Sequence, residues 1–137
     1  MNLTCDRCGQ PIRSWRELVV WCDSGKAQQS RQEFEAWERK RTREGEDALA
    51  NGDMDAWLKT VVYPLSELTR LKLEPWLVVH LDCITDEEWE WGYPIEGRRI
   101  NTVRKALVWT LHLQEKVWFD FTDWRGVMHK LFGIPEV

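Results

Sequence analysis

Residues 5–12 read CDRCGQPI, and far downstream residues 80–83 read HLDC. Each motif carries two residues whose side chains offer a sulfur or nitrogen donor, with two other residues between them: Cys5 and Cys8 in the first, His80 and Cys83 in the second. Between the two motifs lie 71 residues, 9–79. This pair of motifs decides the fold, because anything that joins them closes the first half of the chain into one large loop.

Thiolate sulfur and imidazole nitrogen at these spacings are typical of a zinc site. Zinc takes four such ligands in a tetrahedron, and a C-x2-C turn points two thiolates at one ion. Gly9 follows Cys8 and suits the positive-φ position that such a turn needs. Cys83 precedes an expected helix, whose N-terminus favours a thiolate. We predict one Zn²⁺ ion held by Cys5, Cys8, His80 and Cys83.

Cys22 is an alternative fourth ligand. In that arrangement Cys5, Cys8, Cys22 and Cys83 hold the ion and His80 is free. In either case four protein ligands fill the tetrahedron and leave no position for water or substrate, so we expect a structural ion. A third interpretation is a set of buried free cysteines beside a core histidine.

Hydrophobic patterning places a strand on each side of the long gap. Residues 17–22 (ELVVWC) and 76–80 (WLVVH) are rich in β-branched and aromatic residues. Thr85 and Glu88 form a capping box that predicts a short helix over 86–91. The carboxylates of this helix are expected to be solvated.

The residues between the two strands are expected to form a helical insertion. Ser30 begins a capping box that predicts a helix over 31–43, which Gly45 ends. Asp53 is expected to cap a second helix that runs to about residue 62. Removing residues 26–71 leaves an ordinary zinc-finger hairpin, and loop-closure entropy grows slowly enough with length to tolerate the insertion.

Two further helices are expected near the C-terminus. Asn101 is the expected cap of the first, over 102–118, and the second begins at Thr122 or Asp123 with a clear apolar stripe. The inward-facing candidates of the first helix are Val103, Leu107, Leu111 and Trp118. The side chains expected to pack the helices on the hairpin are Trp109, Trp118 and Trp124.

These elements predict a mostly helical α+β fold in a single zinc-binding domain over residues 1–137. Residues 1–25 and 72–92 would form a zinc-stapled β-hairpin with a short helix. Residues 26–71 would form the helical insertion, and residues 93–137 the C-terminal helical part.

The ligand order C-x2-C … H-x2-C, with a hairpin between the pairs and a helix at the second pair, resembles a treble-clef zinc finger. It is similar to the first zinc site of LIM domains, with Cys5, Cys8, His80 and Cys83 at the matching positions. The resemblance covers residues 4–22 and 76–91 and implies a structural zinc ion. The chain departs from the pattern in its 71-residue gap.

Charge is distributed unevenly along the chain, whose net charge is −4. Residues 44–96 hold three Lys/Arg against thirteen Asp/Glu, while the segments on either side are each positive by three. The acidic middle repels nucleic acid and can attract a basic protein surface. We therefore expect a non-enzymatic regulatory or adaptor protein that binds another protein through its insertion and acidic middle.

Two other functions have some support in the sequence. Basic clusters could bind nucleic acid, and they consist of Arg39, Lys40, Arg41, Arg43, Arg98 and Arg99. An HNH-type nuclease is a weaker alternative. Its histidine, asparagine and histidine would be His80, Asn101 and His112, but Asn101 already has a simpler role as a helix cap.

The cellular compartment is inferred from composition. Residues 1–10 are polar, so we expect no signal peptide, and the apolar stretches are too short to span a bilayer. Two of the four cysteines form a C-x2-C pair, which favours a metal site over a disulfide framework. We expect a cytoplasmic protein without membrane contact.

Overall fold

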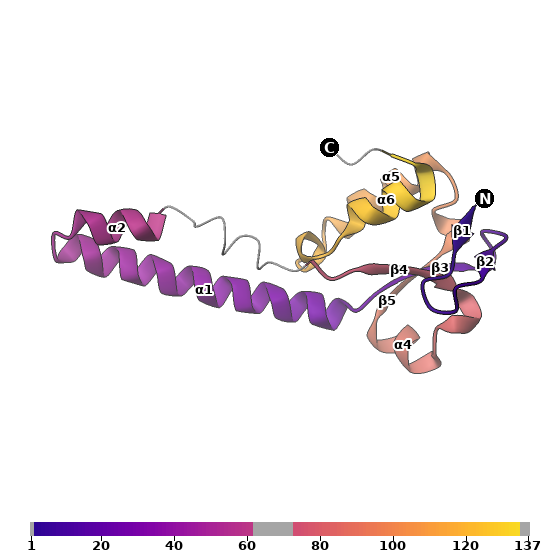
Figure 1. Cartoon of the computed structure of the whole chain (residues 1–137), viewed down its shortest axis with the longest axis horizontal. Coiled ribbons are helices and arrows are strands. Elements are labelled where there is room, and N and C mark those ends of the chain that lie inside the picture. The colour runs from indigo at the N-terminus through magenta and orange to yellow at the C-terminus, as the bar shows by residue number, and fades with distance from the viewer. Residues whose placement is uncertain (1, 62–72, 135–137) are drawn as a thin grey trace. The chain divides into compact units, whose positions relative to one another are not determined.

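The fold was taken from a computed structural model, which describes residues 2–61 and 73–134 (Figure 1). As predicted, the protein has a mostly helical α+β fold. It divides into two compact units: a main unit, Met1–Gln28 with Leu73–Val137, and a helical unit, Gln29–Lys72. Within the described residues, no helix has both the length and the apolar character needed to cross a membrane.

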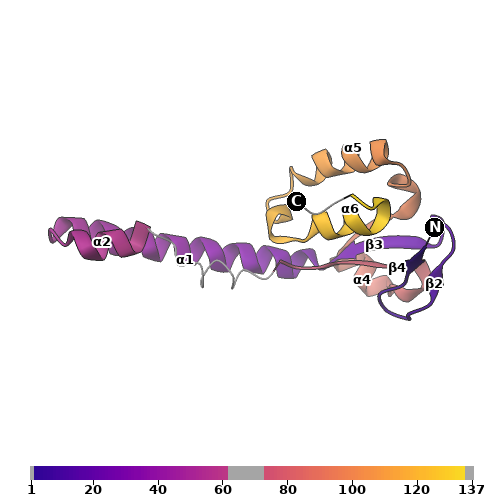
Figure 2. The ribbon, with the colours of Figure 1, turned by 45° about the horizontal axis from the view of Figure 1, so that its top comes forward.

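A three-stranded antiparallel sheet forms the centre of the main unit. Strand β3 (Leu18–Cys22) lies between β4 (Trp76–His80) and β5 (Tyr93–Glu96). Figures 1 and 2 show helices α5 and α6 on one side of this sheet and α4 (Asp86–Trp91) on the other. Covered on both faces, β3 buries all five of its side chains, which explains its unbroken apolar sequence.

The predicted pairing of the two strands across the gap is confirmed. Leu18 of β3 lies opposite His80 of β4, and Cys22 lies opposite Trp76. Strand β5 was not predicted, because glycine and proline, here Gly92 and Pro94, are typical of a break between elements. A proline is compatible with β5 because this strand lies at the edge of the sheet and pairs only with β3.

The helical unit contains most of α1 (Ser24–Ala50) and all of α2 (Met54–Val61). The predicted helix over 31–43 was too short at both ends. It begins earlier because Asp23 Oδ1 accepts a hydrogen bond from the Lys26 backbone N–H at 3.0 Å. It continues through Gly45, where an added Cβ would lie 2.7 Å from Thr60 Oγ1, so this glycine lets α2 approach α1.

The second helix of the insertion is confirmed over its described length. Asp53 Oδ1 accepts a hydrogen bond from the Ala56 backbone N–H at 3.0 Å, which is the predicted cap of α2. The remainder of the predicted insertion, residues 62–71, lies outside the described residues.

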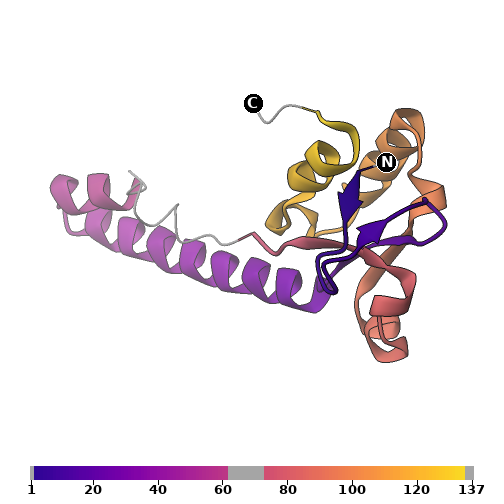
Figure 3. The same ribbon diagram turned by 45° about the vertical axis from the view of Figure 1, so that its right-hand side comes forward.

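The C-terminal helices α5 (Val103–Leu113) and α6 (Trp124–Phe132) pack on the sheet (Figure 3). Trp124 is buried, and its ring lies edge-on to that of Trp76 at 5.1 Å between centroids, as expected. The cap of α5 is Thr102 rather than Asn101, and α5 ends at Leu113 rather than near residue 118.

The predicted inward face of α5 was wrong. Ala106 and Leu113 are buried, whereas Val103, Leu107 and Leu111 are exposed. Apolar residues occur around most of this helix, so periodicity alone did not single out one face. The structure turns the side with Ala106 and Leu113 toward the core and leaves Val103, Leu107 and Leu111 in solvent.

Candidate metal centre

The structure brings four ligand-type side chains into one group. Cys5 and Cys8 lie in the turn between β1 (Leu3–Thr4) and β2 (Pro11–Ile12), His80 ends β4, and Cys83 ends the short 3-10 helix η1 (Leu81–Cys83). One ligand atom from each residue lies within 4.8 Å of all the others. The register of β3 with β4 places His80 at the sheet end from which η1 carries Cys83 back toward the turn.

The separations suit a tetrahedral metal. Cys8 Sγ lies 3.3 Å from His80 Nδ1, and Cys83 Sγ lies 4.0 Å from the same nitrogen. Zinc bonds of about 2.0–2.3 Å to nitrogen and sulfur place neighbouring ligand atoms about 3.5–3.8 Å apart. The side chains therefore need only small movements to surround one ion.

The turn that holds the first two cysteines is closed by its own backbone. Gly9 has φ +73°, and its N–H donates to the Cys5 carbonyl oxygen at 3.0 Å. The His80 N–H points at Cys5 Sγ, 3.4 Å away. Burial raises the pKa of the Cys5 thiol, but hydrogen bonds from the backbones of Cys8, His80 and Arg7 outweigh it and lower the pKa to about 6. The turn thus favours a thiolate at neutral pH.

The ring of His80 is oriented by the second strand of this turn. His80 Nε2 lies 3.0 Å from the Pro11 carbonyl oxygen, which can only accept, so in the neutral ring Nε2 carries the proton and Nδ1 presents its lone pair to the sulfurs. The Pro11 carbonyl also raises the pKa of His80 to about 8. A carbonyl behind the ring is the usual arrangement for a metal-ligating histidine.

Burial and the neighbouring sulfurs both disfavour a thiolate at Cys83. Burial, followed by contacts with the Cys5 and Cys8 thiols, raises the pKa of Cys83 to about 11. A divalent cation among the sulfurs reverses such a shift, because each thiolate is then attracted rather than repelled. The donor set of three sulfurs and one imidazole nitrogen therefore fits a cation of the zinc type.

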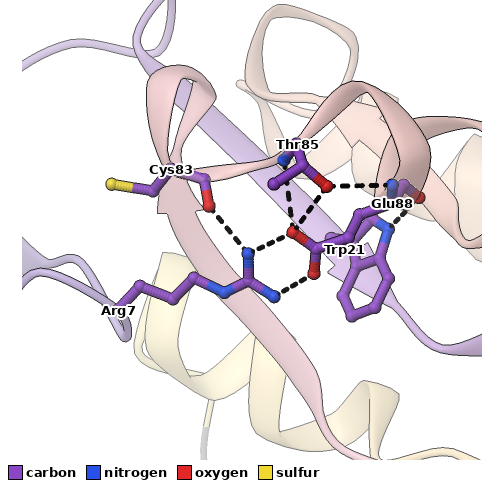
Figure 4. Close-up of polar contacts among 5 residues, drawn as sticks. All are labelled: Arg7, Trp21, Cys83, Thr85 and Glu88. Atoms are coloured by element: carbon purple, nitrogen blue, oxygen red, sulfur yellow. Dashed lines mark hydrogen bonds and ion pairs between the residues drawn. The ribbon is translucent and has the colours of Figure 1, made fainter.

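Arg7, between the first two ligands, ties the turn to α4 (Figure 4). Its guanidinium donates to both carboxylate oxygens of Glu88 and, at 2.7 Å, to the carbonyl oxygen of Cys83. Glu88 also closes the predicted capping box with Thr85. Hydrogen bonding to Arg7 lowers the pKa of Glu88 to about 2. The expectation that the α4 carboxylates are solvated is wrong for Glu88.

Asp6, the other residue between the first two ligands, ties the turn to β4 and α6. The Asp6 N–H donates to the Val78 carbonyl oxygen at 2.9 Å, and the Val78 N–H donates to Asp6 Oδ2 at 2.7 Å. Lys130 Nζ of α6 reaches Asp6 Oδ1 at 2.9 Å. Sequence reasoning missed both Asp6 and Arg7. The signal available was a pair of opposite charges inside a C-x2-C turn, with an acidic helix next to the second ligand pair.

Cys22 does not belong to the ligand group. It lies at the end of β3 that faces Trp76, four residues from Leu18, which faces His80. Its side chain is fully buried, and burial raises the pKa of the thiol well above its ordinary value. Cys22 is thus a core side chain of the sheet.

The three residues of the nuclease alternative, His80, Asn101 and His112, lie in different environments. His80 faces the cysteines. His112 lies on α5, where its Nδ1 is 3.8 Å from a Glu115 carboxylate oxygen. Asn101 precedes the cap of α5, and its Oδ1 is buried without a hydrogen-bond partner in the described structure.

An open groove of about 1730 Å³ runs along the main unit from the loop after β2 to α5. Its large aromatic side chains are Trp15, Trp89 and Trp109. Its charged side chains are Arg16, Asp82, Asp86, Glu96, Arg98, Arg99 and Lys105. Arg98 and Arg99 of the predicted basic clusters thus line a groove, whereas residues 39–43 lie on α1 in the helical unit.

The groove lies next to the candidate metal site along the chain. Four residues beside Cys83 line the groove: Leu81, Asp82, Ile84 and Thr85.

Comparisons with protein-family models, with curated proteins and with solved structures found no match to this chain.

Proposed function

We propose that Cys5, Cys8, His80 and Cys83 hold a structural zinc ion. The support is the donor set and the oriented Nδ1 of His80, which together supply four tetrahedral ligands. Four protein ligands leave no open position for a substrate, so the ion acts on folding: it joins the N-terminal turn to the end of β4 and to η1. Structural zinc contributes on the order of 10 kcal/mol in small zinc domains.

Elemental analysis of the purified chain tests this part of the proposal. We expect one zinc per chain in the wild type, less than a tenth of that in a Cys5→Ser, Cys8→Ser variant, and full zinc in Cys22→Ser. Loss of zinc in Cys22→Ser, with retention in His80→Ala, would show that the ligand set is wrong. A different metal at full occupancy in protein from its native cell would show that the ion is wrong.

We propose further that the protein is a non-enzymatic adaptor that binds a segment of another protein in the groove. The observation that carries this is the set of three tryptophans among charges of both signs. Tryptophan dominates the binding energy of many protein interfaces, because it buries a large area at a low entropy cost. The closed ligand set argues against metal-based catalysis.

The charges of the groove indicate the chemistry of this segment. The carboxylates of Asp82 and Asp86 come from η1 and the start of α4. The cations come mainly from residues 98–105, and Lys105 among them is exposed. A peptide with an aromatic or aliphatic anchor, a basic residue on one side and an acidic residue on the other would match both.

Nucleic acid is the second candidate for the same groove. Arg16, Arg98, Arg99 and Lys105 beside three tryptophans offer phosphate contacts and stacking surfaces. Three carboxylates line the groove as well, and one of them, Glu96, already pairs with Arg98 at 2.5 Å. Because these carboxylates repel phosphates, the groove favours a polypeptide.

A photo-crosslinking amino acid placed at Trp89 in the native cell distinguishes the two. The matched control is the same amino acid at Glu90, which is exposed on the same helix but does not line the groove. We expect a discrete protein adduct from position 89 that is absent from position 90 and reduced at least fivefold by Trp109→Ala. An adduct sensitive to nuclease supports the second candidate, and equal adducts from both positions refute a role for the groove.

A further inference from the structure

Helix α5 carries a row of exposed aliphatic side chains that no described part of the chain covers. Val108 is 61% exposed and Leu111 is 66% exposed, and Val103 and Leu107 beside them are at least half exposed. Isolated exposed aliphatic residues are common, but four on one 11-residue helix form a patch. Such a patch is typical of an interaction surface.

Charged residues close both ends of this row. A helix advances 100° per residue, so Arg104, Val108 and Leu111 fall within an arc of about 60°. Glu115 lies two residues beyond the last residue of α5, in a turn where its N–H donates to the His112 carbonyl oxygen at 3.2 Å. We call these four residues the α5 seam; its spacing of four, three and four residues is that of a helix-pairing surface.

We propose that the α5 seam pairs with the α5 seam of a second copy of this chain, with the two helices antiparallel. An antiparallel pair related by a two-fold axis places Val108 opposite the partner's Leu111. The same register places Arg104 opposite the partner's Glu115. Every contact then occurs twice, which is the property of an isologous interface.

The charge pattern selects a second copy over an unrelated helix. The seam is positive at its N-terminal end and negative at its C-terminal end, so it is complementary to itself only when reversed. Both charged side chains are in solvent: Arg104 is exposed, and the side chain of Glu115 is 76% exposed. A parallel arrangement would oppose like charges at both ends.

The surface is separate from the groove. Lys105 and Trp109 line the groove and lie roughly 90–130° around the helix from the centre of the α5 seam. A dimer through the seam therefore leaves the groove of each copy accessible.

The short helix limits the strength of this dimer. Residues 104–115 span about 16 Å, so each copy would bury much less than the roughly 800 Å² of a standard interface. We expect a reversible dimer with a Kd in the range of about 10–100 μM, visible only as a dependence of mass on concentration.

Sedimentation equilibrium of the zinc-loaded full chain between about 5 and 500 μM tests the proposal, with charge reversal as the perturbation. We expect Arg104→Glu and Glu115→Arg each to raise the dimer Kd at least tenfold, because each opposes like charges twice. The double variant should return within threefold of the wild type. Arg125→Glu, on an exposed position of α6, is the control and should leave the Kd unchanged.

These variants separate association from folding. Glutamate near the start of α5 and arginine near its end both suit the helix dipole, so neither reversal weakens the helix itself. Melting temperatures should therefore stay within about 2 °C of the wild type. A wild-type chain that is monomeric at 500 μM, or a double variant as weak as the single ones, would overturn the proposal.

Discussion

Replacing Arg7 with methionine should weaken zinc binding without changing any ligand. In the structure the Arg7 guanidinium holds the Glu88 carboxylate with two hydrogen bonds and the Cys83 carbonyl oxygen with one. These bonds link the turn of the first two ligands to the residues that follow the second two, so they form only when all four ligands converge. Methionine keeps most of the side-chain bulk and removes the three donors.

The magnitude follows from the exposure of the two partners. The side chains of Arg7 and Glu88 are 32% and 15% exposed, so the two-bond ion pair lies at the upper end of the range for surface pairs, about 1 kcal/mol. The bond to the Cys83 carbonyl adds about 1 kcal/mol. A total of about 2 kcal/mol corresponds to a roughly 30-fold rise in the zinc Kd. Partners behind the ligands typically change metal affinity 10- to 100-fold.

Competition against a chromophoric chelator at pH 7.5 measures this change, and the cobalt-substituted spectrum checks that the ligand geometry is retained. Arg13→Met is the matched control, because it removes a nearby exposed arginine. Arg7→Lys should recover only part of the affinity, since an ammonium cannot hold two carboxylate oxygens in a plane. If Arg7→Met and Arg13→Met bind zinc equally within threefold, the account of Arg7 is refuted.

Three further outcomes can be measured. After chelation, iodoacetamide should label the exposed Cys8 well before Cys22, because burial raises the pKa of the Cys22 thiol and excludes the reagent; peptide mapping that finds Cys22 first contradicts its place in the core. Gly92→Ala should lower the free energy of unfolding by about 1–3 kcal/mol in urea, since the new Cβ would lie 2.1 Å from Trp21 Nε1; an unchanged midpoint contradicts this. Glu74→Gln should raise the melting temperature at pH 7 and raise it less at pH 5. Burial, with a smaller contribution from Asp23, raises the pKa of the Glu74 carboxyl. Its negative charge therefore destabilises the fold above that pKa, and this destabilisation is lost as the carboxyl is protonated. An equal rise in melting temperature at both pH values would contradict this account of Glu74.

The candidate ligands and the strands beside them were predictable because their signals are local. A C-x2-C turn, two strands rich in β-branched residues and the capping box of Thr85 each occupy a few neighbouring residues. Pairing the strands then followed from joining the two ligand pairs, and the observed register of Leu18 with His80 completes the site. The place of Cys22 could be decided only by the register, which sets Leu18 and not Cys22 opposite His80.

The helices show where local signals fail. Glycine is typical of a helix end, yet Gly45 lies within α1. Its role in the approach of α2 to α1 depends on Thr60, fifteen residues later. The edge strand β5 contains Pro94, which argues against a strand until its place at the edge of the sheet is known. On α5 the apolar residues surround the helix, so only packing against the sheet could select Ala106 and Leu113 as the buried side.

The sequence by itself therefore determined the two pairs of candidate ligands, the α+β class and the strands that flank the gap, since each depends on residue type and spacing within a short segment. Only the tertiary structure decided which side of α5 is exposed, that three tryptophans share one groove, and that Arg7 binds Glu88. These depend on contacts between segments far apart in the chain, 81 residues in the case of Arg7 and Glu88, where the energy of a contact comes from burial and geometry that no local pattern encodes.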